Sequence, residues 1–534
     1  MPESDHQTGP PAQPRPSSPG RRGLFVLLCV AGLLYAAGIN SHWRFQRDSA
    51  RYMALARSVA EGDGYRLNYK VQTRVWPGFP AMLVPVYMAV GESFLAMNIL
   101  LSLLGLGSVA AAWALFRQLP LNSRQVTACT LLFGFSRTLY YYSAHIMSDV
   151  PFTFFALVTL ICGTMMLRRS GRAGWLWCIA ASVAACVACF VRPVGPALVI
   201  ALALSVWVTP GVPKGRLALG RTLVILGPIL AAGLAWGIRC ALLRTRYDFS
   251  YFQIFVGRFG VWGLAGRMVS RAPRIVQSLA DTVLGTDLGM AAGVLLGALM
   301  ALGLFAALRR GERLVSIYGL VYLIGICVAS PNRRYLLPAL PALVYWLVLG
   351  CQLAGALLQT RTHALTARRT AVLGSVLLAM AVSTNVGRIG KLVYEARAPG
   401  FYARLDDGRL LDYFALADWL EANAAADDVV LAREYETVHY FSRVRTHYVP
   451  PAMRWWGSKR AMGFIRGAGV SLVIWDPSKD DLTARLPGIA RAHPEVFVPV
   501  TRIGRLEIMR IRAEGIPPGP GWSDAQRAGR LSGT

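Results

Sequence analysis

The chain has 534 residues, of which 54% are hydrophobic and only 16% are charged, a balance too apolar for an ordinary soluble globular protein. A net charge of +28 would favour a nucleic-acid partner in a soluble protein. Here the basic residues follow the membrane-length segments, so no nucleic-acid partner is expected. The composition therefore predicts an integral membrane protein.

Apolar segments of membrane-spanning length recur along the chain. A hydrocarbon core of ~30 Å needs ~20 helical residues to cross it. The first segment lacks a small-residue cleavage signature and is interpreted as a retained span. The predicted fold class is a polytopic α-helical membrane protein with about eleven transmembrane helices, at residues 23–40, 93–116, 124–143, 150–167, 174–190, 194–208, 219–241, 286–308, 314–330, 335–355 and 370–386.

The basic residues set the predicted orientation. Arg21 and Arg22 precede the first span, which puts the N-terminus in the cytoplasm under the positive-inside rule. Two long basic loops, 42–92 and 242–285, then come out external. Short basic corners fall on the cytoplasmic side, at Arg117 and Arg124, Arg168, Arg169 and Arg172, Lys214, Arg216 and Arg221, Arg309, Arg310 and Arg313, and Arg361, Arg368 and Arg369.

An odd number of spans leaves the C-terminal part outside. Its predicted elements are a helix, a strand, a helix, a strand and a final pair of strands, at 409–425, 427–432, 458–469, 470–476, 495–502 and 504–512. We expect a small extracytoplasmic α/β domain at 391–512, after a transmembrane domain at 23–390. The Pro-, Gly- and Ser-rich ends, 1–22 and 513–534, are predicted to be disordered. The expected location is the inner membrane of a cell envelope.

Acidic residues collect at two external corners. The first is HWRFQRDSARYMALARSVAEGDGY, directly after the first span, where Asp48 and Tyr52 share one face of a predicted helix. The second is YYYSAHIMSDVPFTFF, which contains His145 and Asp149. Each aspartate is interpreted either as a helix N-cap or as one of a carboxylate pair around a reacting hydroxyl. Such a pair either shares a divalent cation or acts without a metal.

Basic residues mark two further external corners. FVRPVGPALV carries Arg192, and ASPNRRYLLPALPALV carries Arg333, Arg334 and Tyr335. A single arginine at this depth is explained by snorkelling toward the membrane surface. Three arginines converging on one face favour a phosphate site, because guanidinium groups match phosphate oxygens and a lipid phosphate lies at this level.

These motifs carry a resemblance to a known superfamily. RDSARYMALARSVAEGDGY, WPGFPAML, SDVPF, RPVG and RYLLPALP occur in this order over roughly 23–390. Together they resemble the GT-C superfamily of membrane glycosyltransferases, and within it the bacterial protein O-mannosyltransferases and aminoarabinose transferases. One departure is Ser49, which follows Asp48 where many members have a second acid.

The resemblance implies an inverting glycosyltransferase that moves a sugar from a polyprenyl-phosphate donor to an acceptor hydroxyl at the extracytoplasmic face. Asp48 would be the general base and Asp149 a second acid that orients the acceptor or a cation, and His145 and Tyr52 would help to bind the substrate. Arg192, Arg333, Arg334 and Tyr335 would bind the phosphate. The acceptor is left open among protein, lipid and glycan. The alternatives are a lipid-linked sugar flippase or transporter and a non-catalytic scaffold descended from the same fold.

Overall fold

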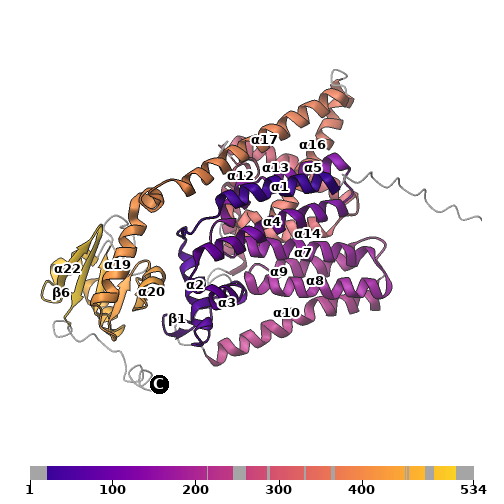
Figure 1. Ribbon diagram of the computed structural model, residues 1–534. Helices are drawn as coiled ribbons and strands as arrows, with labels where there is room; N and C mark the ends of the chain where they lie inside the picture. Colours follow the sequence, from indigo (N-terminus) through magenta and orange to yellow (C-terminus); the bar gives the residue numbers. More distant parts are fainter. Residues whose placement is uncertain are drawn as a thin grey trace, which may run out of the picture.

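The computed structural model describes residues 21–212, 214–243, 260–285, 289–329, 332–362, 367–450, 453, 456–475 and 486–512. Figure 1 shows a bundle of long helices with a smaller domain at one end. The bundle helices are α1 (Arg21–Gly38), α2 (Arg47–Ala60), α3 (Gly78–Val90), α4 (Phe94–Gln118), α5 (Ser123–Gly134), α6 (Arg137–Ser143), α7 (Asp149–Arg168), α8 (Gly171–Val191), α9 (Pro196–Val208), α10 (Arg216–Leu242), α12 (Gly260–Leu284), α13 (Gly289–Arg309), α14 (Leu314–Ala329), α15 (Arg333–Leu336), α16 (Leu340–Thr362) and α17 (Ala367–Arg397).

Seven helical stretches among the described residues are long and apolar enough to cross a membrane: α4, α7, α8, α10, α13, α15 with α16, and α17. Three more predicted spans correspond to the shorter apolar helices α1, α9 and α14. The predicted span 124–143 is not one continuous helix, because α5 ends at Gly134 and α6 begins at Arg137. Ser136 caps the new helix by accepting a hydrogen bond from the Leu139 amide.

The loop predicted at 242–285 contains the 25-residue helix α12. Its buried residues Ile275, Leu279 and Val283 recur every four positions, so one apolar face of the second half of the helix packs inward. The arginines led the sequence interpretation to treat this segment as loop. The helix matters for the site because it delivers Asp281 to the start of α15.

Small residues allow close helix contacts inside the bundle. A Cβ atom on Gly303 of α13 would lie 1.6 Å from the Trp346 carbonyl oxygen of α16, and one on Gly350 of α16 would lie 1.8 Å from the Leu299 carbonyl oxygen. The backbones of α13 and α16 therefore touch, and no side chain larger than hydrogen fits at either position.

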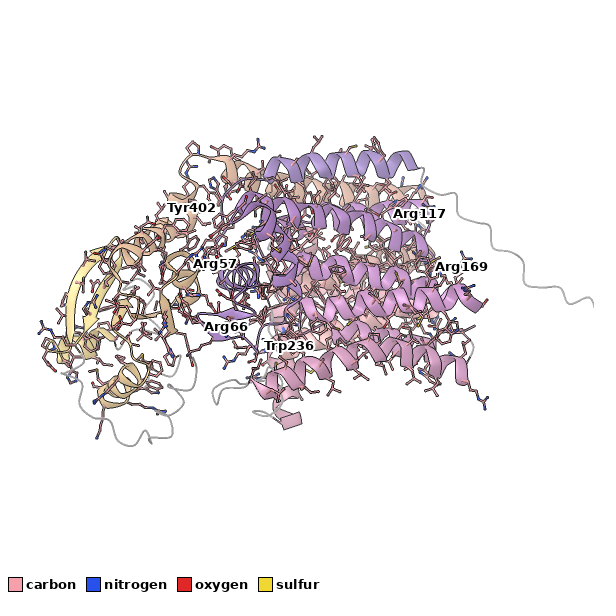
Figure 2. The ribbon with its side chains drawn as sticks, turned by 60° about the horizontal axis from the view of Figure 1, so that its bottom comes forward. Arg57, Arg66, Arg117, Arg169, Trp236 and Tyr402 are labelled. Atoms are coloured by element: carbon pink, nitrogen blue, oxygen red, sulfur yellow. The ribbon has the colours of Figure 1, made fainter. Side chains whose placement is uncertain are left out.

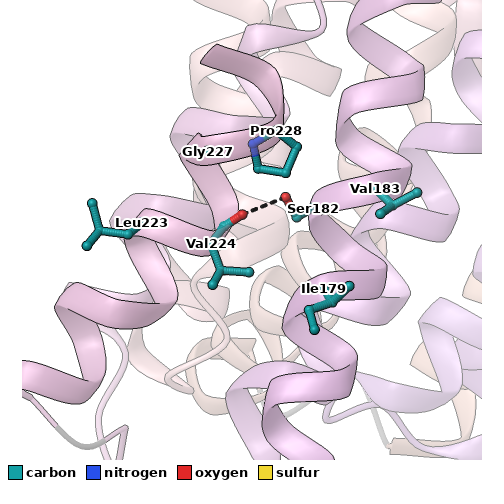
Figure 3. Close-up of a pocket in the computed structure, with 7 residues that line it drawn as sticks. All are labelled: Ile179, Ser182, Val183, Leu223, Val224, Gly227 and Pro228. Carbon is teal, nitrogen blue, oxygen red and sulfur yellow. Dashed lines mark hydrogen bonds between the residues drawn. The ribbon is translucent and has the colours of Figure 1, made fainter. Parts of the chain in front are cut away.

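Helix α10 contains Pro228, which cannot donate to the Val224 carbonyl one turn earlier. The Ser182 hydroxyl of α8 donates to that carbonyl at 2.8 Å, as the dashed line in Figure 3 shows, and to the Ile225 carbonyl at 3.3 Å. A neighbouring helix thus satisfies the group that proline leaves unpaired.

The C-terminal region forms a five-stranded sheet in the order β4-β3-β5-β7-β6. Strand β3 is parallel to β4 and β5, whereas β7 is antiparallel to β5 and β6. Successive residues of a strand face opposite sides, so Val430 and Leu431 belong to different hydrophobic clusters. The elements are α18 (Phe401–Arg404), α19 (Arg409–Asn423), β3 (Val429–Ala432), α20 (Tyr435–Ser442), β4 (Arg445–Tyr448), α21 (Ser458–Gly467), β5 (Leu472–Trp475), α22 (Leu486–Ala492), β6 (Phe497–Ile503) and β7 (Leu506–Ile511).

Candidate active site

Asp48 lies in the first turn of α2, the helix that follows the first apolar span. The N-cap of α2 is Gln46, so the interpretation of Asp48 as the cap is wrong. Its Oδ2 accepts a hydrogen bond of 2.9 Å from Nη2 of Arg334, and its Oδ1 lies 3.9 Å from Nη1 of Arg51. Burial opposes ionisation, but the charges of Arg51 and Arg334 outweigh it and hold the pKa of Asp48 below its ordinary value. Asp48 is therefore a carboxylate at neutral pH.

Asp149 begins α7 and forms a second ion pair with an arginine. Its carboxylate is fully buried, and Oδ1 accepts a short hydrogen bond from Arg192 at the C-terminal end of α8. The other oxygen, Oδ2, has no hydrogen-bond partner. Ser148 is the N-cap of α7 but makes no capping hydrogen bond through its side chain. The start of α7 and the end of α8 are thus joined by one charge pair.

Tyr335 connects the two ion pairs. The guanidinium carbon of Arg334 lies 4.7 Å from the Tyr335 ring centroid, and that of Arg192 lies 5.1 Å from it. The phenol oxygen also accepts a hydrogen bond of 2.9 Å from Nη2 of Arg334. Arg192 and Arg334 thus lie against one aromatic ring, and each of them pairs with an aspartate. Together these residues form a compact polar cluster at the end of an apolar bundle.

Tyr52 joins α2 to the start of α7. It lies one turn after Asp48, and its hydroxyl is 3.3 Å from the Ser148 hydroxyl. Burial and the nearby Asp48 charge raise the pKa of Tyr52 to about 12, so this phenol stays protonated. The corner that carries Asp149 therefore contacts the helix that carries Asp48.

Two of the candidate residues point elsewhere. Arg333 donates to Oδ2 of Asp281 on α12 at 2.8 Å, and the same carboxylate lies 3.6 Å from Arg137. His145 is 4% exposed, and its Nδ1 is 2.6 Å from the Tyr141 carbonyl oxygen. Burial, helped by the charge of Arg44, lowers the pKa of His145 to about 3, so its imidazole is neutral.

The donor set fits a resident divalent cation poorly. Both aspartates already pair with arginines, and over the described ranges no group of three His, Cys, Asp or Glu side chains is arranged to hold a metal. A hard cation would need several more oxygen ligands than the two carboxylates supply.

The overall architecture matches solved membrane glycosyltransferases. The ArnT structure from Cupriavidus metallidurans with bound undecaprenyl phosphate aligns with a TM-score of 0.61 at 15% identity, over 93% of this chain and 100% of ArnT. The oligosaccharyltransferase AglB from Archaeoglobus fulgidus, in complex with an inhibitory peptide and a dolichol-phosphate, aligns with a TM-score of 0.55 at 12% identity, over 92% of this chain and 74% of AglB. This chain has the GT-C glycosyltransferase fold.

A sequence-family match covers part of the GT-C bundle. The dolichyl-phosphate-mannose-protein mannosyltransferase family matches residues 84–218, a range that includes Asp149 and Arg192 but not Asp48. No protein with a curated description matches the chain. The resemblance inferred from the motifs is thus confirmed by the fold and by this partial family match.

Arg51 and Asp281 are charged partners of the cluster that the sequence interpretation did not single out as site residues. Arg51 stands three positions after Asp48, a helical spacing that places the two side chains together. Asp281 had no sequence signal, since it lies in a segment interpreted as loop.

Proposed function

We propose that the protein is an inverting glycosyltransferase that moves a sugar from a polyprenyl-phosphate donor to an acceptor hydroxyl at the extracytoplasmic membrane face. The observation that carries this proposal is the Asp48–Arg334 pair beside the Asp149–Arg192 pair, with Tyr335 between them. This reaction most needs a general base and guanidinium groups that bind the phosphate.

The reaction follows from this arrangement. Asp48 accepts the acceptor hydroxyl proton while the acceptor oxygen forms a bond to the anomeric carbon of the sugar. The bond between that carbon and the phosphate oxygen breaks with its electron pair, and the polyprenyl phosphate leaves with the negative charge. Attack from the face opposite the leaving group inverts the anomeric centre. The work of the protein is to position the reactants, take one proton and stabilise the phosphate.

Arg334 and Arg192, with the Tyr335 hydroxyl, supply the phosphate side. Arg334 pairs with Asp48, so an arriving phosphate competes for the same guanidinium. As the phosphate takes over Arg334, Asp48 loses part of the positive field that lowers its pKa and becomes a stronger base. Donor binding thereby prepares the base for the acceptor.

The remaining candidates are proposed in supporting roles. Asp149, with its unpartnered Oδ2, orients the acceptor. Tyr52 and His145 stabilise the corner in front of α7, and Arg333, held by Asp281, meets the lipid side of the donor. The acceptor is a protein, lipid or glycan hydroxyl.

We propose that the bundle sits in the inner membrane with its N-terminus in the cytoplasm. Figure 2 shows Arg117 and Arg169 at the end of the bundle far from Arg57 and Tyr402. The first end carries the predicted cytoplasmic corners, and the positive-inside rule supports this orientation. Residues 23–390 would then form the transmembrane catalytic domain of about eleven spans, and 391–512 an extracytoplasmic α/β domain.

The test is transfer from a labelled polyprenyl-phosphate sugar in membranes, comparing wild type with Asp48→Asn at equal amounts of folded protein. Loss of the general base should lower kcat by about 10²–10⁴-fold. Asp63→Asn is the matched control, because Asp63 lies exposed in the same external loop, and it should keep wild-type turnover. Equal turnover of Asp48→Asn and Asp63→Asn would remove Asp48 from the reaction.

The same assay distinguishes the alternatives. An enzyme transfers or hydrolyses the labelled sugar in detergent, whereas a flippase shows activity only across a bilayer with two leaflets. A scaffold shows neither. Wild-type protein that moves the lipid between leaflets without transfer would replace the glycosyltransferase proposal by the flippase.

A further inference from the structure

Arg51 lies between two acids that belong to different parts of the chain. Its Nη1 is 3.9 Å from Oδ1 of Asp48 on the same helix. Its Nε donates to Oε1 of Glu436 at 2.7 Å, and its Nη2 makes a shorter hydrogen bond to the same oxygen. Glu436 is 1% exposed and comes from α20 of the C-terminal sheet domain. Glu436 of the C-terminal domain therefore binds Arg51, the arginine that lies next to Asp48.

The interface that brings Glu436 to this position is a specific one. The Arg57 guanidinium of α2 donates to the Tyr440 carbonyl at 2.8 Å, and the Tyr87 and Tyr440 hydroxyls are 2.6 Å apart. The Asn68 amide donates to Nε2 of His439 at 3.1 Å. These bonds connect α2, the following loop and α3 to α20, so the position of Glu436 relative to Arg51 is fixed.

A two-residue turn adds to this contact. Asn68 and Tyr69 both have positive φ angles, 53° and 63°, which asparagine tolerates but which are unfavourable for a tyrosine. The Asn68 side chain accepts from the Thr446 amide at 2.7 Å, and the Tyr69 hydroxyl donates to the Arg443 carbonyl at 2.6 Å. The turn keeps its strained conformation while it reaches the C-terminal domain.

We propose that Glu436 is a positioning residue that holds Arg51 away from Oδ1 of Asp48 and keeps this oxygen open for the acceptor hydroxyl. The inference rests on the proposed function, in which Asp48 is the base. Arg334, and the phosphate that it would bind, lie on the Oδ2 side of the carboxylate, so Oδ1 is the oxygen that remains for the acceptor. Two of the three guanidinium nitrogens of Arg51 are bonded to Glu436, which leaves one directed at Asp48.

Removal of the Glu436 charge frees Arg51 to turn toward Asp48. Residues three apart on a helix are neighbours, and a guanidinium pairs with a carboxylate through two parallel hydrogen bonds. Such a pair would cover Oδ1 and make Asp48 a weaker base. One Glu436 oxygen has no hydrogen-bond partner, which is costly for a buried carboxylate that serves packing alone.

The test compares kcat and donor KM of wild type, Glu436→Gln, Glu61→Gln and the double variant Arg51→Met/Glu436→Gln. Glu61 is the matched control, because it pairs with Arg443 across the same two segments at 3.2 Å but is exposed and far from the cluster of acids. We expect Glu436→Gln to lower kcat on the order of tenfold or more, as part of the general-base contribution, with donor KM unchanged. Glu61→Gln should match wild type. The double variant should regain most of the lost turnover, since no guanidinium is left to cover Oδ1.

The outcomes separate this inference from the proposed function. Wild-type transfer with loss in Asp48→Asn establishes the function first. Given that result, undiminished kcat in Glu436→Gln overturns the positioning role and leaves the function standing. A double variant as slow as Glu436→Gln, or slower, shows that Glu436 only holds the interface together and also overturns the role. Absence of transfer by wild type removes both.

Discussion

Replacement of Arg192 by methionine would leave the buried Asp149 carboxylate without its hydrogen-bond partner. Asp149 is fully buried, Arg192 is its hydrogen-bond partner, and the second carboxylate oxygen has none. Breaking a buried pair on one side costs about 3–5 kcal/mol, which is roughly two to four decades in the unfolding equilibrium. We expect Arg192→Met to be the least stable single variant of the charged cluster.

The measurement is the midpoint temperature at which the purified protein in detergent loses monodispersity. Arg333→Met is the comparison, because its partner contact to Asp281 is 42% exposed on the arginine side and is expected to contribute less than about 1 kcal/mol. Asp149→Leu combined with Arg192→Met removes both charges with little change in volume and should recover most of the stability. The double variant should still be inactive.

Two results would refute this reasoning. One is an Arg192→Met midpoint equal to that of Arg333→Met. The other is a double variant no more stable than Arg192→Met, because the cost would then arise from lost packing around Arg192 and not from the unpaired carboxylate of Asp149.

The remaining predictions concern other parts of the chain. Burial lowers the pKa of His439 to about 4, so between pH 6.5 and 4 the unfolded state binds a proton that the folded state does not bind. The free energy of unfolding should therefore fall by about 3 kcal/mol as the pH drops from about 6.5 to 4. Hydrogen exchange of α20 measures this loss. His439→Gln should remove this contribution and leave that of His145. Ser182→Ala should cost about 1 kcal/mol in thermal stability, and almost nothing once Pro228→Ala restores the helical partner of the carbonyl. Gly303→Ala should prevent the close contact of α13 with α16 and abolish folded yield, whereas Gly227→Ala, with open space around it, should express normally.

The lengths and order of the apolar segments predicted most of the bundle, because a bilayer requires about 20 apolar helical residues whatever the tertiary structure. Local chemistry decided the exceptions. Ser136 starts a new helix within the predicted third span, and α12 is helical because its apolar residues recur on one face although its arginines resemble those of a loop. Helices α20 and α22 and strand β4 are too short for a periodic pattern to identify them.

The predicted order of the spans places the candidate acids and arginines at helix ends on one membrane face. Their pairing was beyond reach of the sequence, since Arg334 is 286 positions from Asp48 and Arg192 is 43 positions from Asp149. The order of the spans does not tell which arginine pairs with which acid. It also gives neighbouring Arg333 and Arg334 the same predicted position, although they pair with Asp281 and Asp48 respectively. Glu436 has no local motif at all, because its role depends on how two domains pack.

The length of helix α17 determines how the C-terminal domain is rotated relative to the bundle. Its 31 residues extend about 46 Å, more than the ~30 Å of a bilayer core, and Figure 1 shows it running from the bundle to the sheet domain. Only residues 398–400 separate it from α18, and the Trp43 amide holds that junction through the Tyr402 hydroxyl at 2.8 Å. One inserted residue turns a helix by about 100°, which would swing α20 away from α2, whereas seven residues nearly restore the angle and lift the domain by about 10 Å. The distance between the sheet domain and the bundle can thus change only by nearly whole numbers of helical turns, so natural length changes in this helix should be about seven or eleven residues.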